Sequence, residues 1–168
     1  MQVFNVDGLR FSFPEKWGVA KYDEWIFYRK NFCKVHDGIK SLDLLAICPD
    51  KVLWLIEVKD YRSHRRTKTI DIADEVCKKI FDTLAAIIPA KINSNETNEK
   101  EMASRFVKAK SLRVVLHLEQ PQKHSKLFPR AIDPANVKQK MKNKLKSIDA
   151  HPVVVETKNM RGLNWSVA

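Results

Sequence analysis

Two apolar runs joined by a proline turn place the strongest constraint on how this chain folds. We expect strands at about 39–48 and 51–61, with Pro49 and Asp50 breaking the apolar pattern between them. Apolar runs of this length, bounded by turn residues, indicate buried strands that pair as a hairpin. The chain is therefore predicted to be built around a β-sheet.

Three charged residues interrupt these apolar strands. Asp43 lies inside the first, while Glu57 and Lys59 lie two apart in the second, so on a strand they share one face and Val58 takes the other. The hairpin brings Asp43 to Glu57, and two facing like charges are destabilising without a cation. A buried carboxylate also requires a partner or a metal. The pattern favours a divalent cation held by carboxylates, with an ammonium beside it to act on a water or a phosphate.

A plainer interpretation of the same charges stays open. Asp43 could be a strand-end residue that accepts backbone hydrogen bonds. Glu57 and Lys59 could form a cross-strand ion pair on a solvated face, where such pairs contribute little to stability.

The remaining elements predict an α/β sandwich whose central mixed β-sheet is flanked by helices. The order of elements after the N-terminal β-hairpin and first helix is strand, strand, helix, strand, helix, strand. We expect one domain over residues 1–168, which is a length typical of a single core. The expected further elements are a hairpin at 3–13, a helix at about 20–32, a helix at 71–88 that stops at Pro89, a strand at 112–118, a helix at 133–148 and a strand at 152–156.

The charge of the chain points to a polyanionic partner. The formal net charge is +11, so nucleic acid is the first expectation and an acidic membrane surface the second. Two basic segments could track phosphates, although a solvated surface is an equally good account of the second. The candidate nucleic-acid-binding residues are Arg62, Arg65, Arg66, Lys68, Lys138 and Lys142.

Compartment signals favour a cytoplasmic protein with no membrane partner. The N-terminal residues lack the basic-then-apolar order of a signal peptide. No apolar run approaches the roughly 20 residues that a membrane span needs. Three scattered cysteines fit a reducing cytosol better than a disulfide framework or a zinc site.

The site hairpin resembles a known signature. Asp43, thirteen further residues and then Glu57-Val58-Lys59 are similar to the motif of the PD-(D/E)xK nuclease superfamily, which includes restriction endonucleases and archaeal-type Holliday junction resolvases. The resemblance implies a restriction-endonuclease-like fold. It also implies that Asp43, Glu57 and the backbone carbonyl of Val58 bind Mg²⁺ or Mn²⁺. Lys59 would orient or deprotonate the attacking water.

The resemblance further implies an acid on the first helix that points at the metal. Glu24 fits this catalytic role best and Asp23 is the alternative. Some members carry a glutamine or lysine on the helix after the site strand, where this chain offers Lys78 and Lys79. The proline that often precedes the first acid is replaced by Leu42.

These expectations converge on a Mg²⁺-dependent deoxyribonuclease acting as an endonuclease. DNA is placed ahead of RNA as the partner, although no residue separates the two. The alternative is a catalytically silent nucleic-acid-binding adaptor of the same fold. A homodimer is compatible with a small catalytic domain, and sequence specificity cannot be read from these residues.

Overall fold

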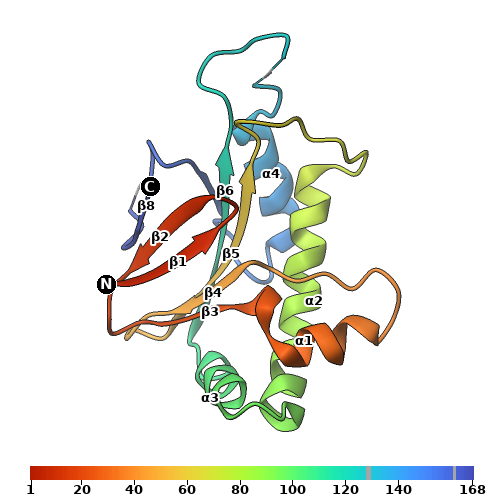
Figure 1. Ribbon diagram of the computed structural model, residues 1–168, viewed down its shortest axis with the longest axis vertical. Coiled ribbons are helices and arrows are strands. Elements are labelled where there is room, and N and C mark those ends of the chain that lie inside the picture. Colours follow the sequence, from red (N-terminus) through yellow and green to blue (C-terminus); the bar gives the residue numbers. More distant parts are fainter. Residues whose placement is uncertain (128–129, 161) are drawn as a thin grey trace.

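The chain is a mixed α/β structure, seen in a computed structural model that describes residues 1–127, 130–160 and 162–168. Within these residues there are two sheets and four α-helices (Figure 1). The helices are α1 (Ile26–Lys30), α2 (Ile72–Asn93), α3 (Thr97–Phe106) and α4 (Pro134–Leu145). The strands are β1 (Gln2–Val6), β2 (Leu9–Phe13), β3 (Gly18–Lys21), β4 (Leu44–Ile47), β5 (Val52–Asp60), β6 (Ser111–Glu119), β7 (Val153–Val155) and β8 (Ser166–Val167). Among the described helices, none has the length and apolar character to cross a membrane.

The larger sheet is mixed, as the sequence predicts. Its order is β3-β4-β5-β6-β7, with antiparallel pairing from β3 to β5 and parallel pairing from β5 to β7. Leu44 pairs with Ile56 across the β4–β5 hairpin, so residue 43 lies beside the end of β5 that carries residue 57. This register confirms the expected meeting of the two strands.

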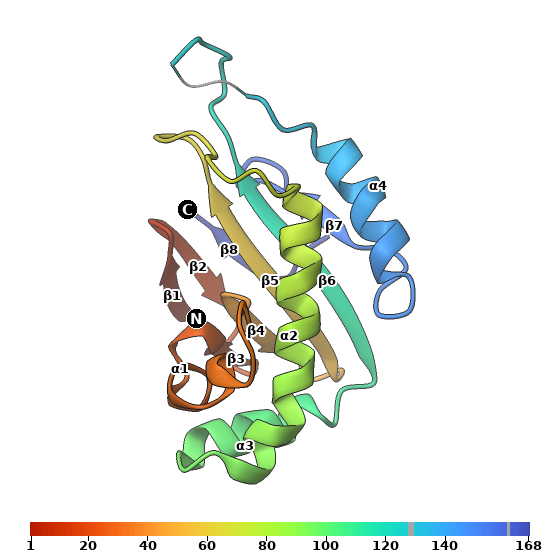
Figure 2. The same ribbon diagram turned by 90° about the vertical axis from the view of Figure 1, so that its right-hand side faces the viewer.

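Two apolar layers cover the larger sheet. Leu53 and Leu55 of β5 belong to a core cluster with α2 and α4, whereas Ile56 and Val58 pack against the small β1-β2-β8 sheet. The alternation of a strand thus sends odd-numbered residues of β5 toward the helices. Figure 2 shows α2 lying along this face with α4 beside it.

The N-terminal hairpin forms as expected, with Asp7 and Gly8 both at positive φ (47° and 78°) in the tight turn. The C-terminal residues add β8 to it, a strand that the sequence did not predict.

Asp71 and Asp133 accept hydrogen bonds from backbone amides at the starts of α2 and α4, as their N-cap positions predict.

The expectation of one helix over residues 20–32 is wrong. Ala20 pairs with Leu45 in β3, and a 3₁₀ turn (Tyr22–Glu24) precedes the short α1. Trp25 separates the two with ψ at 133°, which is incompatible with a continuous helix. The aromatic pattern arises because successive turns each bury one ring, those of Tyr22, Trp25 and Phe27.

The expected end of the helix at Pro89 is also wrong, because α2 continues to Asn93. Proline removes a backbone donor and disfavours a helix interior. Here Ile87 and Ala90 on either side of it lie in the core, and Ala90 also accepts a hydrogen bond from Ser94 at the helix end. Burial of the last turn therefore outweighs the local preference.

Candidate active site

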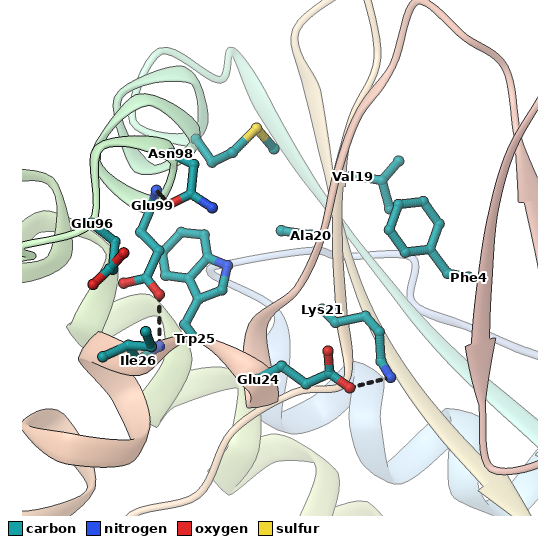
Figure 3. Close-up of a pocket in the computed structure, with 11 residues that line it drawn as sticks. Phe4, Val19, Ala20, Lys21, Glu24, Trp25, Ile26, Glu96, Asn98 and Glu99 are labelled. Atoms are coloured by element: carbon teal, nitrogen blue, oxygen red, sulfur yellow. Dashed lines mark hydrogen bonds and ion pairs between the residues drawn. The ribbon is translucent and has the colours of Figure 1, made fainter.

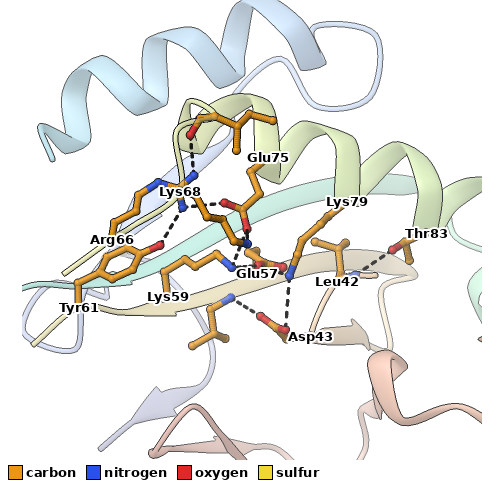
Figure 4. Close-up of polar contacts among 12 residues, drawn as sticks. Leu42, Asp43, Glu57, Lys59, Tyr61, Arg66, Lys68, Glu75, Lys79 and Thr83 are labelled. Carbon is orange, nitrogen blue, oxygen red and sulfur yellow. Dashed lines mark hydrogen bonds and ion pairs between the residues drawn. The ribbon is translucent and has the colours of Figure 1, made fainter. Parts of the chain in front are cut away.

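Four charged side chains converge at the carboxyl end of β5 (Figure 4). Asp43 precedes β4, Glu57 and Lys59 come from the helix-facing side of β5, and Lys79 reaches down from α2. The Oε1 atom of Glu57 contacts both ammonium groups, at 2.7 Å from Lys59 Nζ and 2.5 Å from Lys79 Nζ. The structure therefore brings together the three residues that the sequence singled out and adds a second lysine.

Asp43 engages two partners at once. Its Oδ2 accepts a hydrogen bond from the Val58 amide at 2.7 Å, and its Oδ1 lies 3.9 Å from Lys79 Nζ. The backbone bond is the contact that the plainer interpretation of Asp43 predicts. The second contact places the Lys79 ammonium between Asp43 and Glu57.

Glu57 lies in an environment that opposes its charge. Its side chain is 0% exposed, and among the described residues its Oε2 has no hydrogen-bond partner. Burial and the nearby charge of Asp43 raise the pKa of Glu57 to about 7, against the opposing effect of Lys79 and Lys59. This burial excludes the solvated ion pair that was the plainer interpretation of Glu57 and Lys59.

The same buried surroundings also shift the pKa values of Asp43 and Lys59. Burial raises the pKa of Asp43, although Lys79 and the Val58 amide partly offset the effect. Burial disfavours the charged form of Lys59, but the ion pairs with Glu57 and other acids outweigh it and raise the pKa of this lysine. Lys59 is therefore held as an ammonium.

Glu75 on α2 extends this arrangement and was missed by the sequence reasoning. It is buried and lies 3.3 Å from Lys59 Nζ, so the acids and lysines alternate in space. We call this row the charge ladder: Asp43, Lys79, Glu57, Lys59 and Glu75. Glu75 and Lys79 are four apart on α2 and so share one face of the helix. That spacing beside the buried stripe was the available signal.

Two basic residues of the loop after β5 form ion pairs with Glu75, the last residue of the charge ladder. Arg66 Nη1 lies 2.6 Å from Glu75 and also donates to the Tyr61 hydroxyl, while Lys68 Nζ lies 2.5 Å from Glu75. Burial alone would raise the pKa of Glu75, but hydrogen bonds from Lys68 and Arg66 lower it to about 2. Both basic residues thus neutralise a buried acid, besides any contact with a ligand.

The rest of this loop forms a polar pocket beside Lys59. Arg62 is paired with Asp60 at 2.7 Å, and Arg65 Nε donates to the Leu127 carbonyl. The pocket has a volume of about 230 Å³, and Lys59 and Arg65 both line it. A phosphate could therefore approach Lys59 from the loop side.

The lysines of α4 fall into two classes. Lys140 and Lys144 pair with acids at the start of α2, at 2.6 and 2.8 Å. Lys138 and Lys142 are exposed, and neither is in an ion pair with any residue the structure describes. Only the second class presents uncompensated charge to a polyanion.

The structure separates Glu24 from its neighbour Asp23. Glu24 is 51% exposed, pairs with Lys21 at 2.5 Å and lines a pocket of about 520 Å³ with Glu99 (Figure 3). Asp23 instead has a buried Oδ1 with no partner among the described residues, and burial followed by the charge of Asp43 raises its pKa. Of the two acids in this turn, Asp23 is therefore the one whose pKa is raised by the charge of Asp43.

Asp43 and Glu57 are the residues of the site that could hold a divalent cation. In the described part of the chain there is no group of three or more His, Cys, Asp or Glu residues that could hold a metal. Mg²⁺, however, is commonly held by one or two carboxylates and keeps several waters. Asp43 and Glu57 supply that number, and the unpartnered buried Oε2 of Glu57 is a free acceptor. The Val58 amide holds Asp43 in place.

Comparisons with known proteins give one curated relative and no family. The chain is 28% identical to a protein named Cysteine--tRNA ligase from Neisseria meningitidis serogroup A, serotype 4A. The alignment covers 95% of this chain but 29% of that protein. No family model matches the chain, and no solved structure matches it.

These findings correct one expectation from the sequence. Assignment to the PD-(D/E)xK nuclease superfamily is wrong, because the matching protein is a tRNA ligase and no nuclease family is found. The motif from Asp43 to Lys59 is short, and a strand hairpin with these charges can arise outside that superfamily.

Proposed function

We propose that this chain is a metal-dependent nuclease that hydrolyses phosphodiester bonds, with DNA as the expected substrate. Asp43 and Glu57 would hold Mg²⁺ or Mn²⁺, and Lys59 would assist the attacking water. The observation that carries this proposal is Glu57, which is fully buried, has no partner for its Oε2 among the described residues, and shares the Lys79 ammonium with the second carboxylate, Asp43. A buried carboxylate oxygen without a partner costs stability, and a bound cation would supply that partner.

Each residue has a role that follows from its surroundings. The Val58 amide fixes Asp43, and the β5 backbone fixes Glu57, so the two acids are positioned before any ligand arrives. Lys59 is held by Glu57 and Glu75 and stays charged, which suits it to stabilise negative charge on a phosphate more than to remove a proton. A bound Mg²⁺ supplies a water of lowered pKa and offsets charge on the phosphate.

The charge of the chain supports a nucleic-acid substrate, and the curated relative adds RNA to DNA as a candidate. The net charge of +11 suits a nucleic acid, as do the exposed Lys138 and Lys142, which form no ion pair with a described residue. The curated relative is named as a tRNA ligase, which brings RNA in as a second substrate to test. Ligase activity itself is not proposed, since the chain spans only 29% of that protein.

The proposal also includes a more specific fold for the mixed α/β structure. A restriction-endonuclease-like sandwich is supported by the order of the mixed sheet and by acids at the junction of β4 and β5. A homodimer, which would present two such sites to a duplex, stays a prediction.

A specific observation favours a second candidate, the silent nucleic-acid-binding adaptor. Both carboxylates already contact Lys79, and Lys59 also contacts Glu57. A site neutralised in this way is stable without a metal. In the adaptor, the charge ladder would serve only to join α2 to the sheet.

Cleavage assays separate the two candidates. Supercoiled plasmid and a tRNA transcript are incubated with Mg²⁺ or Mn²⁺ and the wild type, Asp43→Asn, Lys59→Met or Lys78→Met. We expect metal-dependent cutting of at least one substrate, a loss of about 100-fold or more in the first two variants, and no change in the last. Lys78 pairs with Asp82 and is a matched control. Salt-sensitive binding without cutting would support the adaptor, and neither binding nor cutting would refute both.

A further inference from the structure

Lys79 occupies the space that the proposed cation would need. Its Nζ lies 2.5 Å from Glu57 Oε1 and 3.9 Å from Asp43 Oδ1, and its side chain is 13% exposed (Figure 4). Asp43 and Glu57 are the two carboxylates that would hold the metal. The ammonium is therefore the counter-ion of this pair in the metal-free protein.

We propose that Lys79 is a built-in counter-ion that a divalent cation must displace, so that metal binding at Asp43 and Glu57 is an exchange of one cation for another. This inference rests on the proposed function, because it concerns the same two carboxylates. It assigns Lys79 a positioning role in the metal-free state, since it keeps two like charges together.

The contacts of Glu57 make the exchange necessary. Its Oε1 already meets the ammonium groups of Lys59 and Lys79, whereas its Oε2 has no partner among the described residues. A divalent cation that uses both acids would stand next to the Lys79 charge in a buried place, where like charges repel strongly. Lys59 can stay, because Glu75 holds it from the other side.

The side chain of Lys79 is suited to leave. It carries a compact charge on a flexible four-carbon stem. Its contact with Asp43 is long, at 3.9 Å, so one short contact to Glu57 retains it. Lys59 by contrast has closer contacts to both of its acids, at 2.7 Å from Glu57 and 3.3 Å from Glu75. The two lysines therefore differ in how readily a metal can displace them.

Mn²⁺ binding measures the exchange directly, without any need for activity. Free Mn²⁺ is followed by electron paramagnetic resonance during titration of the wild type, Lys79→Met, Lys79→Gln and the control Lys78→Met. We expect Mn²⁺ to bind both Lys79 variants at least tenfold more tightly than wild type, and the control to match wild type. Adding Asp43→Asn should abolish the tight binding.

Thermal unfolding gives a second readout. In EDTA, Lys79→Met should unfold at a lower temperature than wild type, because the two acids lose their counter-ion, and Mn²⁺ should restore more stability to it than to wild type. Lys79→Gln, which can still donate a hydrogen bond, keeps the test available if Lys79→Met fails to fold.

The possible failures are distinguishable. Equal or weaker Mn²⁺ binding in the Lys79 variants would overturn the exchange while leaving the metal site and the proposed function intact. Absence of Mn²⁺ binding in wild type and all variants would overturn the metal site itself, and with it the proposed function.

Discussion

Replacement of Glu75 by glutamine tests how far the charge ladder stabilises the fold. Glu75 is buried and contacts Lys59, Arg66 and Lys68, and its pKa is lowered from 4.5 to about 2. A lowering of this size corresponds to about 3 kcal/mol of stability at pH 7. Because the folded-state pKa is the lower one, this stability is present above pH 4.5 and is lost as the pH falls toward 2.

Urea unfolding of wild type and Glu75→Gln at pH 7 and pH 3 gives the measurement. The difference in unfolding free energy should include about 3 kcal/mol from this ionisation at pH 7 and roughly half of that at pH 3. Glu101→Gln, an exposed acid on α3, should change stability little at either pH. A difference that stays the same at both pH values, or one below 1 kcal/mol at pH 7, would refute this account of Glu75.

A single substitution at Tyr22 and a double substitution on α4 test a buried hydroxyl and two exposed lysines. The buried hydroxyl of Tyr22 has no hydrogen-bond partner among the described residues, so Tyr22→Phe should leave stability unchanged or raise it by about 1 kcal/mol; a clear loss in urea unfolding would contradict this. Replacing Lys138 and Lys142 together by alanine should reduce the slope of log affinity against log salt for nucleic acid by about 1.8. The matched pair Lys140 and Lys144, already paired with acids, should change that slope less, and the opposite order would contradict the assignment.

The central hairpin of the larger sheet could be predicted because both of its strands, β4 and β5, carry their own signal. The apolar runs at 39–48 and 51–61 and the turn at Pro49 fix the hairpin, and its register follows from the alternation of a strand. The segment at 20–32 failed because aromatic residues at close spacing satisfy a helix pattern and a series of turns equally well. Only the pairing of Ala20 with Leu45 in the sheet decides between them.

The strand residues of the candidate site could be predicted from the sequence, whereas on the helix Lys79 was only an alternative to Lys78, and Glu75 was missed. Asp43, Glu57 and Lys59 are conspicuous because charges inside apolar strands are rare. Glu75 and Lys79 look like an ordinary surface pair on an amphipathic helix, since nothing local shows which strand the helix packs against. Long-range packing of α2 on β5 turns them inward, whereas their spacing in the sequence shows only that they share one helix face beside the buried stripe.

The charges of the site lead to a last prediction, that metal and phosphate bind cooperatively. The charge ladder holds three acids and two lysines, and with Arg66 and Lys68 at its end the balance is +1 when all of these groups are ionised. A divalent cation alone would raise this local charge to +3, or to +2 if Lys79 withdraws, whereas a phosphodiester beside Lys59 would lower it. Mn²⁺ should therefore bind about tenfold more tightly with a phosphorothioate oligonucleotide present, a size typical of coupled sites. An oligonucleotide with neutral methylphosphonate linkages is the control. Equal Mn²⁺ affinity with both would show that the phosphate charge does not reach the site, and that Lys59 does not face the substrate.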